Sequence, residues 1–330
     1  MKKNVFIGID VSKATLDVSL LVAEVNQQHH GQFTNAAKGF RKLLSFVKQH
    51  APAEQCLLCL EDTGVYSLSL CHFLSAAGLD YVLESAYRIK HSMGIVRGKS
   101  DKTDAAIIAR YAHRFHDQLT PHRLPSTRLS ELKFLLAHRA RLIRHKSRLT
   151  VTLSETKLAA GVLDISFILA SLRAQVEQTK KQLEKVNEQI EQLLETEQGL
   201  SEQYRLLRSV PGVGLMIAAH VLAFSEGFTR FRDWRKFACY IGTAPFPNQS
   251  GTSVRGRTKI SHIAHKRLKG LMTIGAVNTL KRGSEYRKYY ERKLKEGKHH
   301  MVILNSIRNK LLSRMFAVVR RNTPYVALQM

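Results

Sequence analysis

Acidic residues are scarce in this sequence. Lys and Arg number 52 against 26 Asp and Glu, so the net charge is +26 and the isoelectric point is near 10.2. No apolar run reaches the roughly 18 residues that span a bilayer. The first residues, MKKNVFIGID, lack a signal-peptide layout because an Asp interrupts the apolar run. We therefore expect a cytoplasmic protein, and a charge excess of this size indicates nucleic acid as the partner in preference to an anionic membrane surface.

Cysteine is also rare, with four in the chain. Cys56 and Cys59 form a single C-x-x-C, a spacing that zinc and redox sites use. They lie within the apolar run 55–60, which predicts a buried strand with the two thiols on opposite faces, and no second ligand pair follows at zinc-site spacing. We interpret both as small buried hydrophobic residues. An apolar fraction of 44% and a length of 330 residues argue against disorder and allow two or three packed units.

Residues 1–118 predict an α/β domain of the RNase H-like class around a mixed sheet. Apolar runs and helical spacings alternate along this region, and several strands precede a strand–helix–strand–helix tail. The predicted strands are 4–10, 17–22, 32–34, 55–60 and 81–83, with the polar stretch 26–31 as a hairpin connection. The predicted helices are 36–49, 66–77, which is stopped by Gly78, and 102–115.

Residues 119–202 predict a basic helix followed by a helix with a heptad pattern. The stretch 120–154 carries eight Lys or Arg and one acid, Glu131. The heptad predicts an antiparallel helical hairpin or a coiled coil between subunits, with one long helix packed inside the monomer as the alternative. Its members are Leu172, Val176, Thr179, Leu183, Val186, Ile190 and Leu193.

Residues 203–330 predict a mainly α-helical domain that contacts phosphates. The stretch 206–219 has the layout of a helix-hairpin-helix, whose glycine amides can approach a phosphate, although V-P-G-V-G also suits an ordinary turn. Residues 251–330 carry 19 Lys or Arg against three acids. In the two regions after residue 118, the predicted nucleic-acid contacts are Arg141, Arg144, Arg148, Gly212, Gly214, Arg255, Arg257, Lys259, Lys266 and Arg267.

Four acids are placed to form a metal site. Asp10 and Glu61 end two strands that are neighbours in an RNase H-like sheet, and Asp101 and Asp104 share one face where a helix begins. A two-metal site for phosphoryl transfer needs several oxygen ligands at one point, because Mg²⁺ is a hard octahedral cation. Each acid alone also fits a turn or a helix cap. The four together, in so basic a chain, predict a site for Mg²⁺, with Mn²⁺ as a substitute.

An actin-like ATPase is the rival interpretation of the first strand, because that fold also ends its first strand in G-I-D. Such a fold needs Gly-rich phosphate loops later in the chain. Only the turn at 210–214 offers anything similar, and it lies in another predicted domain.

Several stretches of the chain match one known family. They are IGIDVSKATLDV (7–18), LEDTGVY (60–66), GKSDKTDAAIIAR (98–110), LLRSVPGVG (206–214), FACYIGTAPFPNQSGTSVRG (237–256) and KISHIAHKRLKGLM (259–272). Together they resemble the DEDD transposases of the insertion-sequence family "one-ten" and their Piv-type invertase relatives, which are bridge-RNA-guided serine recombinases. The chain departs from that pattern at Asp62, where the family usually has a small residue, and at Glu84-Ser85, where it often has Asn-Pro. The position at the end of the strand favours Glu61 over Asp62 as the inward acid.

The resemblance implies a RuvC-like domain that holds Mg²⁺ (1–118), a coiled-coil insertion (119–202) and a C-terminal transposase domain that carries a catalytic serine (203–330). Mapped through S-G-x-S-V-R-G, that serine is Ser250, with Ser253 as the local competitor. Arg255 or Arg257 would stabilise the charge on the phosphorane.

The resemblance further implies a bacterial enzyme that acts at the nucleoid. It would excise and insert its element through a serine–DNA intermediate, guided by an RNA that pairs with donor and target DNA. A dimer or tetramer joined through the 172–194 helix is expected. The alternatives are a junction-resolving nuclease, which needs the four acids but not Ser250, and a non-catalytic RNA-binding protein.

Overall fold

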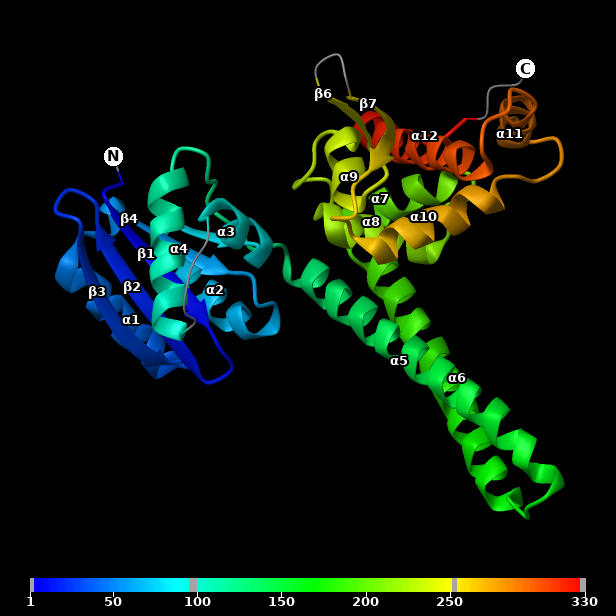
Figure 1. Cartoon of the computed structure of the whole chain (residues 1–330), viewed down its shortest axis with the longest axis horizontal. Helices are drawn as coiled ribbons and strands as arrows, with labels where there is room; N and C mark the ends of the chain where they lie inside the picture. The colour runs from blue at the N-terminus through cyan, green and yellow to red at the C-terminus, as the bar shows by residue number, and fades with distance from the viewer. Residues whose placement is uncertain (1–2, 95–99, 251–253, 327–330) are drawn as a thin grey trace. The chain divides into compact units, whose positions relative to one another are not determined.

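The computed structural model describes residues 3–94, 100–250 and 254–326. Their contacts divide the chain into two compact units, Met1–Leu124 and Pro125–Met330, and each unit has hydrophobic clusters of its own (Figure 1). The finer division at residues 118 and 202 stays a prediction. Within the described ranges, no helix is long and apolar enough to cross a membrane.

The first unit is a five-stranded mixed sheet with helices on both faces. The strand order is β3-β2-β1-β4-β5, in which β1, β4 and β5 run parallel and the β1–β2 and β2–β3 pairs are antiparallel. Helices α1 and α2 pack on one face, and α3 and α4 on the other. The elements are β1 (Val5–Val11), β2 (Thr15–Val22), β3 (Gln27–Thr34), α1 (Ala37–His50), a 3₁₀ turn (Ala53–Gln55), β4 (Cys56–Glu61), α2 (Val65–Ala76), β5 (Tyr81–Glu84), α3 (Ala86–Ser92) and α4 (Asp101–Phe115).

The backbone of β1 is in direct contact with α4. Side chains alternate between the two faces of a strand, so Ile7 and Ile9 are buried against α1 and α2 while Phe6 packs against α4. Gly8 also faces α4, and a Cβ atom there would lie 2.2 Å from both the Ala105 carbonyl oxygen and the Ala109 nitrogen. Only glycine permits this close approach, which holds α4 against the strand that ends near Asp10.

The predicted elements of this unit are confirmed except near its third strand. The stretch 26–31 is not a loop, because β3 begins at Gln27 and pairs with β2 from that residue onward. An edge strand exposed on one face tolerates polar residues, so polarity alone did not mark a turn. Helix α3 was not predicted. Cys56 and Cys59 are buried on opposite faces of the sheet, as their spacing predicted.

The second unit is mainly helical, with one two-stranded antiparallel sheet that was not predicted. Its cluster of buried residues draws on all eight helices, α5 to α12. The elements are α5 (Thr127–Lys157), a 3₁₀ turn (Leu158–Gly161), α6 (Ser166–Thr196), α7 (Gln198–Ser209), α8 (Leu215–Ser225), α9 (Trp234–Ile241), β6 (Pro245–Ser250), β7 (Val254–Ile260), α10 (Lys266–Asn278), α11 (Glu285–Lys295) and α12 (His300–Arg321).

Helices α5 and α6, each of 31 residues, lie side by side as a long hairpin (the green helices of Figure 1). At its base, Leu136 of α5 and Ile190 of α6 belong to the core of the second unit. Further out, Leu142 of α5 and Val176 and Leu183 of α6 are buried. The predicted heptad stripe thus packs against α5 of the same chain, and a coiled coil between subunits stays a prediction.

Candidate metal centre and nucleic-acid surfaces

Four acids form a row across the sheet of the first unit. Asp10 on β1 pairs with Asp17 on β2, and Glu61 on β4 pairs with Glu84 on β5. The parallel register of β1 and β4 makes Asp10 and Glu61 neighbours. Because all four alternate in phase with residues that pack on α4, their side chains share the α4 face. Asp10 and Glu61 therefore end neighbouring strands, as the sequence predicted, while their joint role as metal ligands stays a prediction.

Two further acids reach this face from the first turn of α4. Ser100 caps that helix by accepting a hydrogen bond from the Thr103 backbone N–H at 3.2 Å. Single carboxylate oxygens of Asp10, Asp101 and Asp104 all lie within 4.8 Å of one another. Oxygens on opposite sides of an octahedral Mg²⁺ lie about 4.2 Å apart. The donor type and the spacing therefore suit a hard divalent cation.

The surroundings of Asp10 change the pKa of its carboxyl group. Burial, followed by the negative charges of Asp104, Glu61, Asp101 and Asp17, raises the pKa of Asp10 to about 6. A cation among these carboxylates would offset the repulsion and favour the ionised form of Asp10. The arrangement is thus electrostatically strained without a positive charge and relieved by one.

Glu61 and Asp62 occupy different environments. Glu61 is half-buried and its charge acts on Asp10. Asp62 is exposed, and its Oδ1 accepts a hydrogen bond from the Gly64 backbone N–H at 3.1 Å, which caps the turn before α2. The acid directed toward the cluster is therefore Glu61.

Sequence reasoning missed Asp17 and Glu84 as members of the row. Asp17 is 9% exposed and accepts a hydrogen bond from Gln32 Nε2 at 3.0 Å. Glu84 accepts hydrogen bonds from the Tyr111 hydroxyl and the Arg88 guanidinium, both at 3.0 Å. The usable signal was that each is an acid within or ending a predicted strand. Their alignment with Asp10 and Glu61 depends on the strand order, which that signal does not contain.

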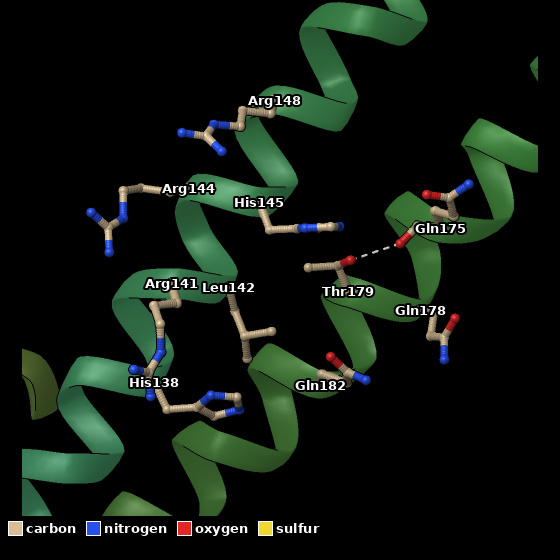
Figure 2. A pocket seen from close by; sticks show the side chains of 10 residues that line it. All are labelled: His138, Arg141, Leu142, Arg144, His145, Arg148, Gln175, Gln178, Thr179 and Gln182. Carbon is tan, nitrogen blue, oxygen red and sulfur yellow. Dashed lines mark hydrogen bonds between the residues drawn. The ribbon is translucent and has the colours of Figure 1, made fainter. Parts of the chain in front are cut away.

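The predicted contacts on α5 line a groove between α5 and α6. Arg141, Arg144 and Arg148 border this cavity of about 740 Å³ (Figure 2). At the start of α10, burial and the charges of Arg139 and Arg144 lower the pKa of Arg267. The charges on α5 and at the start of α10 therefore act on one another, although these residues are distant in the sequence.

The predicted glycine turn joins α7 to α8. It lines a second hollow, which has a volume of about 820 Å³. Gly212 has φ +80°, and a Cβ atom there would lie 2.5 Å from the Thr279 methyl group and 2.6 Å from the Gly275 carbonyl oxygen. Close packing against α10 is thus one reason for glycine at this position. Gly214 precedes α8, and Arg208 and Lys281 line the same hollow. A helix-hairpin-helix that binds phosphate stays a prediction.

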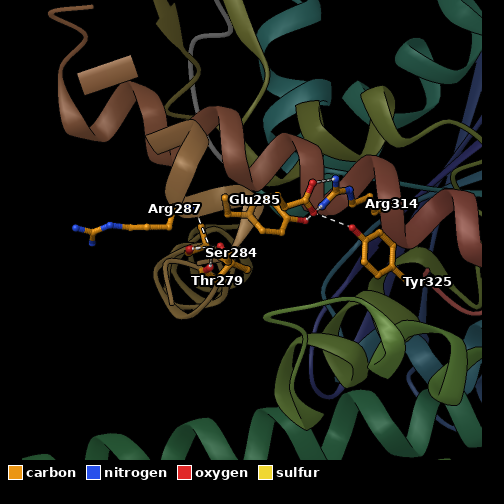
Figure 3. Close-up of polar contacts among 8 residues, drawn as sticks. Thr279, Ser284, Glu285, Arg287, Arg314 and Tyr325 are labelled. Carbon is orange, nitrogen blue, oxygen red and sulfur yellow. Dashed lines mark hydrogen bonds and ion pairs between the residues drawn. The ribbon is translucent and has the colours of Figure 1, made fainter. Parts of the chain in front are cut away.

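One wall of this hollow is held by the polar contacts that Figure 3 shows. Glu285, the first residue of α11, accepts hydrogen bonds from Arg314 Nη2 at 2.9 Å and from the Tyr325 hydroxyl at 2.7 Å. Ser284 caps α11 by accepting a hydrogen bond from the Arg287 backbone N–H at 3.1 Å. The charge of Glu285 is therefore paired with Arg314, and Arg208 and Lys281 are basic residues that line the same hollow.

Two family models match the chain. One, a model of DEDD transposases of the IS110 type described as "Transposase", matches residues 7–158 and takes in Asp10, Glu61, Asp101 and Asp104. The other, described as "Transposase IS116/IS110/IS902 family", matches residues 204–291. The chain belongs to this transposase family. It is therefore an enzyme that acts on DNA, and its first unit has the RNase H-like fold of the DEDD transposases.

Individual relatives are similar over most of the transposase. A pilin gene-inverting protein of Moraxella bovis is 26% identical over 328 residues, which cover 97% of each chain. An uncharacterized 42 kDa protein of insertion element IS900 from Mycobacterium paratuberculosis is 24% identical over 392 residues, covering 98% of each. An uncharacterized 43.6 kDa protein of insertion element IS110 from Streptomyces coelicolor is 30% identical over 171 residues, covering 52% of this chain and 41% of the relative.

The predicted serine belongs to the β6–β7 hairpin of the transposase. The backbone of Ser250 ends β6 and pairs with Val254, while Arg255 pairs with Gln249. The structure does not describe the side chains of Ser250, Arg255 and Arg257, and Ser253 lies outside the described residues. Lys259, further along β7, is exposed, as is Lys266 at the start of α10. The roles of these residues stay predictions.

Proposed function

We propose that this transposase moves an insertion sequence as an RNA-guided recombinase, by Mg²⁺-dependent strand cleavage and exchange through a serine–DNA intermediate. One observation carries the proposal. Carboxylate oxygens of Asp10, Asp101 and Asp104 meet within 4.8 Å in the region that the DEDD transposase model matches. Strand-end acids on a rigid sheet, faced by acids at a helix start, suit a centre that handles phosphodiesters.

Asp10, Glu61, Asp101 and Asp104 would hold Mg²⁺, or Mn²⁺ in its place. When bound, such an ion supplies positive charge at the scissile phosphate and activates the attacking oxygen. The chain itself contributes the geometry, because the strand ends and the Ser100 cap fix where the four carboxylates stand. Asp17 and Glu84, held by their own hydrogen bonds, extend the negative field across the sheet.

Ser250 is the proposed nucleophile. Its hydroxyl oxygen attacks the phosphorus, a Ser–O–P bond forms, and one P–O ester bond of the DNA breaks to leave a free hydroxyl end. Attack by the hydroxyl end of another strand then releases the serine and rejoins DNA without ATP. Arg255 or Arg257 would stabilise the extra negative charge at phosphorus. The pilin gene-inverting relative supports rejoining over simple cutting, because inverting a segment requires that every cut end be sealed.

The guide and both DNA partners would meet the basic surfaces of the second unit. Base pairing by the guide RNA supplies sequence specificity, while Arg141, Arg267 and Lys259 contact backbone phosphates. The net charge of +26 supports a nucleic-acid load larger than one short duplex. The turn at Gly212 and Gly214, flanked by Arg208 and Lys281, is a further proposed phosphate contact.

Recombination of two DNA partners needs more than one active site, so we propose a dimer or tetramer. The heptad stripe of α6 packs against α5, so we propose the apolar tip of the hairpin as a surface for a second copy. Leu158, Val162 and Phe167 are 85%, 86% and 82% exposed there. Exposed apolar clusters of this kind mark association surfaces.

Replacement of Ser250 by Ala tests the serine chemistry. With labelled donor and target DNA, Ser250→Ala is expected to abolish both the covalent protein–DNA adduct and recombination, while the matched control Ser253→Ala retains both. Normal recombination by Ser250→Ala would mean that the serine mechanism is wrong and would favour the nuclease. Full activity after Asp10→Ala or Glu61→Ala would instead favour a non-catalytic RNA-binding protein.

Sequencing of the RNA that copurifies with the transposase tests guidance. The proposal expects one discrete RNA that is transcribed from the element and pairs with donor and target. Recovery of only heterogeneous cellular RNA would contradict guidance and leave the DNA chemistry intact.

A further inference from the structure

We infer that the groove between α5 and α6 binds an unpaired stretch of polynucleotide, with phosphates along the arginines of α5 and bases toward the glutamines of α6. This inference rests on the proposed function, because it assigns a place to part of the nucleic acid that the transposase must hold. It adds a binding subsite to the proposed function and specifies that the bound strand is unpaired. Neither point follows from the carboxylates or from Ser250.

The α5 side of the groove is a ladder of cations. Arg141, Arg144 and Arg148 follow i, i+3, i+7 spacing, so successive side chains are about 5–6 Å apart at their Cβ atoms. All three are exposed, and none forms an ion pair within the part of the chain that the structure describes. In Figure 2 the guanidinium groups of Arg144 and Arg148 extend from α5 on the side away from α6. They would therefore hold the phosphates of a strand on the α5 side while its bases turn toward α6.

The α6 side of the groove is polar and uncharged. Gln175, Gln178 and Gln182 repeat the same i, i+3, i+7 spacing, and each amide offers both donors and an acceptor. The opposite flank of α6 differs, because Glu177 and Lys180 form an ion pair there at 2.6 Å. Among the described residues, the lining of the groove includes no acid and no lysine. Amides along one helix and cations along the other suit base edges on one side and phosphates on the other.

The floor of the groove suits the flat faces of bases. Leu142 and Thr179 are 9% and 6% exposed, and the Thr179 hydroxyl is already engaged, because it donates to the Gln175 carbonyl oxygen at 2.7 Å. Figure 2 shows the His145 ring pointing across the groove toward Thr179, and His138 lines the same cavity. Aromatic rings on a partly apolar floor provide stacking surfaces for unpaired bases.

The width of the groove argues for one strand. Two packed helices have axes about 8–10 Å apart, whereas the major groove of a DNA duplex is itself about 12 Å wide. A base-paired duplex is wider than this spacing and would rest on the rim, whereas unpaired bases can reach the floor at Leu142 and Thr179. Positive charge continues beyond the groove, because Arg144 and Arg139 both act on the pKa of Arg267 at the start of α10. A bound strand would leave the groove along that basic path.

Binding of fluorescent oligonucleotides to the full chain, in EDTA so that no strand is cut, tests the inference. The probes are single-stranded RNA and DNA of about 12 nucleotides and a duplex of the same length. The groove variant carries Arg141→Gln, Arg144→Gln and Arg148→Gln. The matched control carries Arg173→Gln, Lys180→Gln and Lys181→Gln, which remove the same charge from exposed positions of α6 outside the cavity lining.

The groove variant is expected to weaken single-strand binding at least about 10-fold and to flatten the slope of log K against log salt by about 2, since each phosphate contact contributes about 0.7. The control is expected to change affinity less than about 2-fold. Gln178→Ala with Gln182→Ala is expected to weaken binding about 3-fold or more without changing the slope, because no charge is removed.

Equal losses in the two charge variants, or a duplex affected as strongly as the single strands, would overturn the inference. A preference for RNA over DNA would support it and would add a 2′-hydroxyl contact, while equal binding supports contacts to phosphates and bases alone. Because no divalent ion is present, failure here leaves the adduct and recombination tests of Ser250 unaffected. Loss of recombination in Ser250→Ala likewise leaves groove binding unchanged.

Discussion

The two units of the transposase concentrate charge of opposite sign in different ways. In the first, Asp10, Asp101 and Asp104 converge on one point at the ends of a strand and a helix start. In the second, Arg144 and Arg148 are spaced along an exposed helix. Convergence suits a small cation, which needs several ligands at once, and spacing suits a polymer that carries charge at intervals. The geometry of a like-charged cluster therefore indicates the size of the ion that it opposes.

The comparison extends to protons. In the first unit, Asp10 has its pKa raised to about 6 by burial and by neighbouring acids. In the second, burial, aided by the charges of Arg267, His265 and Arg139, lowers the pKa of His220 to about 4. Each unit thus disfavours the charged form of one group. Lowering the pH is expected to stabilise the first unit through Asp10 and to destabilise the second through His220.

The largest effect is expected from replacing Asp10, which lies at the centre of the acidic cluster. Asp10→Asn should lower recombination by about 1,000-fold or more, because it removes the charge of a proposed metal ligand at the centre of the cluster. The matched control, Asp62→Asn, should stay within about 2-fold of the unsubstituted enzyme, since Asp62 only caps a turn. The measurement is excision and insertion frequency in cells. Equal losses of recombination in the two variants would contradict a special role for the acidic cluster.

The next largest effect is expected from a change that disturbs the position of α4 and leaves its acids in place. Gly8→Ala should destabilise the first unit by about 2 kcal/mol or more, because its Cβ would collide with the backbone at Ala105 and Ala109. It should also weaken divalent-cation binding, since α4 carries Asp101 and Asp104. Urea unfolding followed by far-UV circular dichroism measures the first quantity, and calorimetric titration with Mg²⁺ measures the second.

Gly270→Ala is the matched control, because it makes the same substitution at a glycine that is not in close contact. Gly270 lies in α10 with nothing within 4 Å of an added Cβ, so the change should stabilise the second unit by about 0.5–1 kcal/mol. If Gly8→Ala proved as stable as the unsubstituted protein, the close contact of α4 with β1 would be excluded.

A smaller effect is the acid sensitivity of the second unit. The unfolded chain binds a proton at His220 near pH 6.5, whereas the folded unit resists it until about pH 4. Stability from this group is therefore lost as pH falls through that window, by about 2 kcal/mol. Fluorescence of Trp234, the single Trp of the sequence, reports on this unit in urea titrations at each pH. His220→Gln should flatten the dependence, and an unchanged slope would assign it to other groups.

The smallest effect has the opposite sign and belongs to the first unit. The folded form of Asp10 holds its proton up to about pH 6, above its ordinary value of 3.8. Without divalent cations, stability should therefore rise as pH falls from about 7 to about 4, by about 1 kcal/mol once partial exposure is taken into account. Hydrogen exchange of β1 amides measures it. Mg²⁺ or Asp10→Asn should abolish this component, and its persistence in Asp10→Asn would contradict the assignment.

What the sequence could predict depended on how local each signal was. Apolar runs located β1, β4 and β5, and helical spacing located α1, α2 and α4, so the acids at the ends of β1 and β4 and at the start of α4 were found. Asp17 and Glu84 were missed because their alignment with Asp10 arises only from the strand order β2-β1-β4-β5. In the same way, the heptad revealed a stripe on α6 but not its partner, and no spacing connects Arg144 with Arg267. Pairing between distant segments is decided by packing of the whole unit.

The helical hairpin has a consequence for how such enzymes can vary in size. Its base is anchored in the core through Leu136 and Ile190, while further out Leu142, Val176 and Leu183 are buried along the hairpin itself. Seven residues added to each arm beyond the groove would lengthen the hairpin by about 10 Å and return every side chain to nearly the same face. The reach of the tip can therefore change in steps of one heptad, without altering the core or the groove.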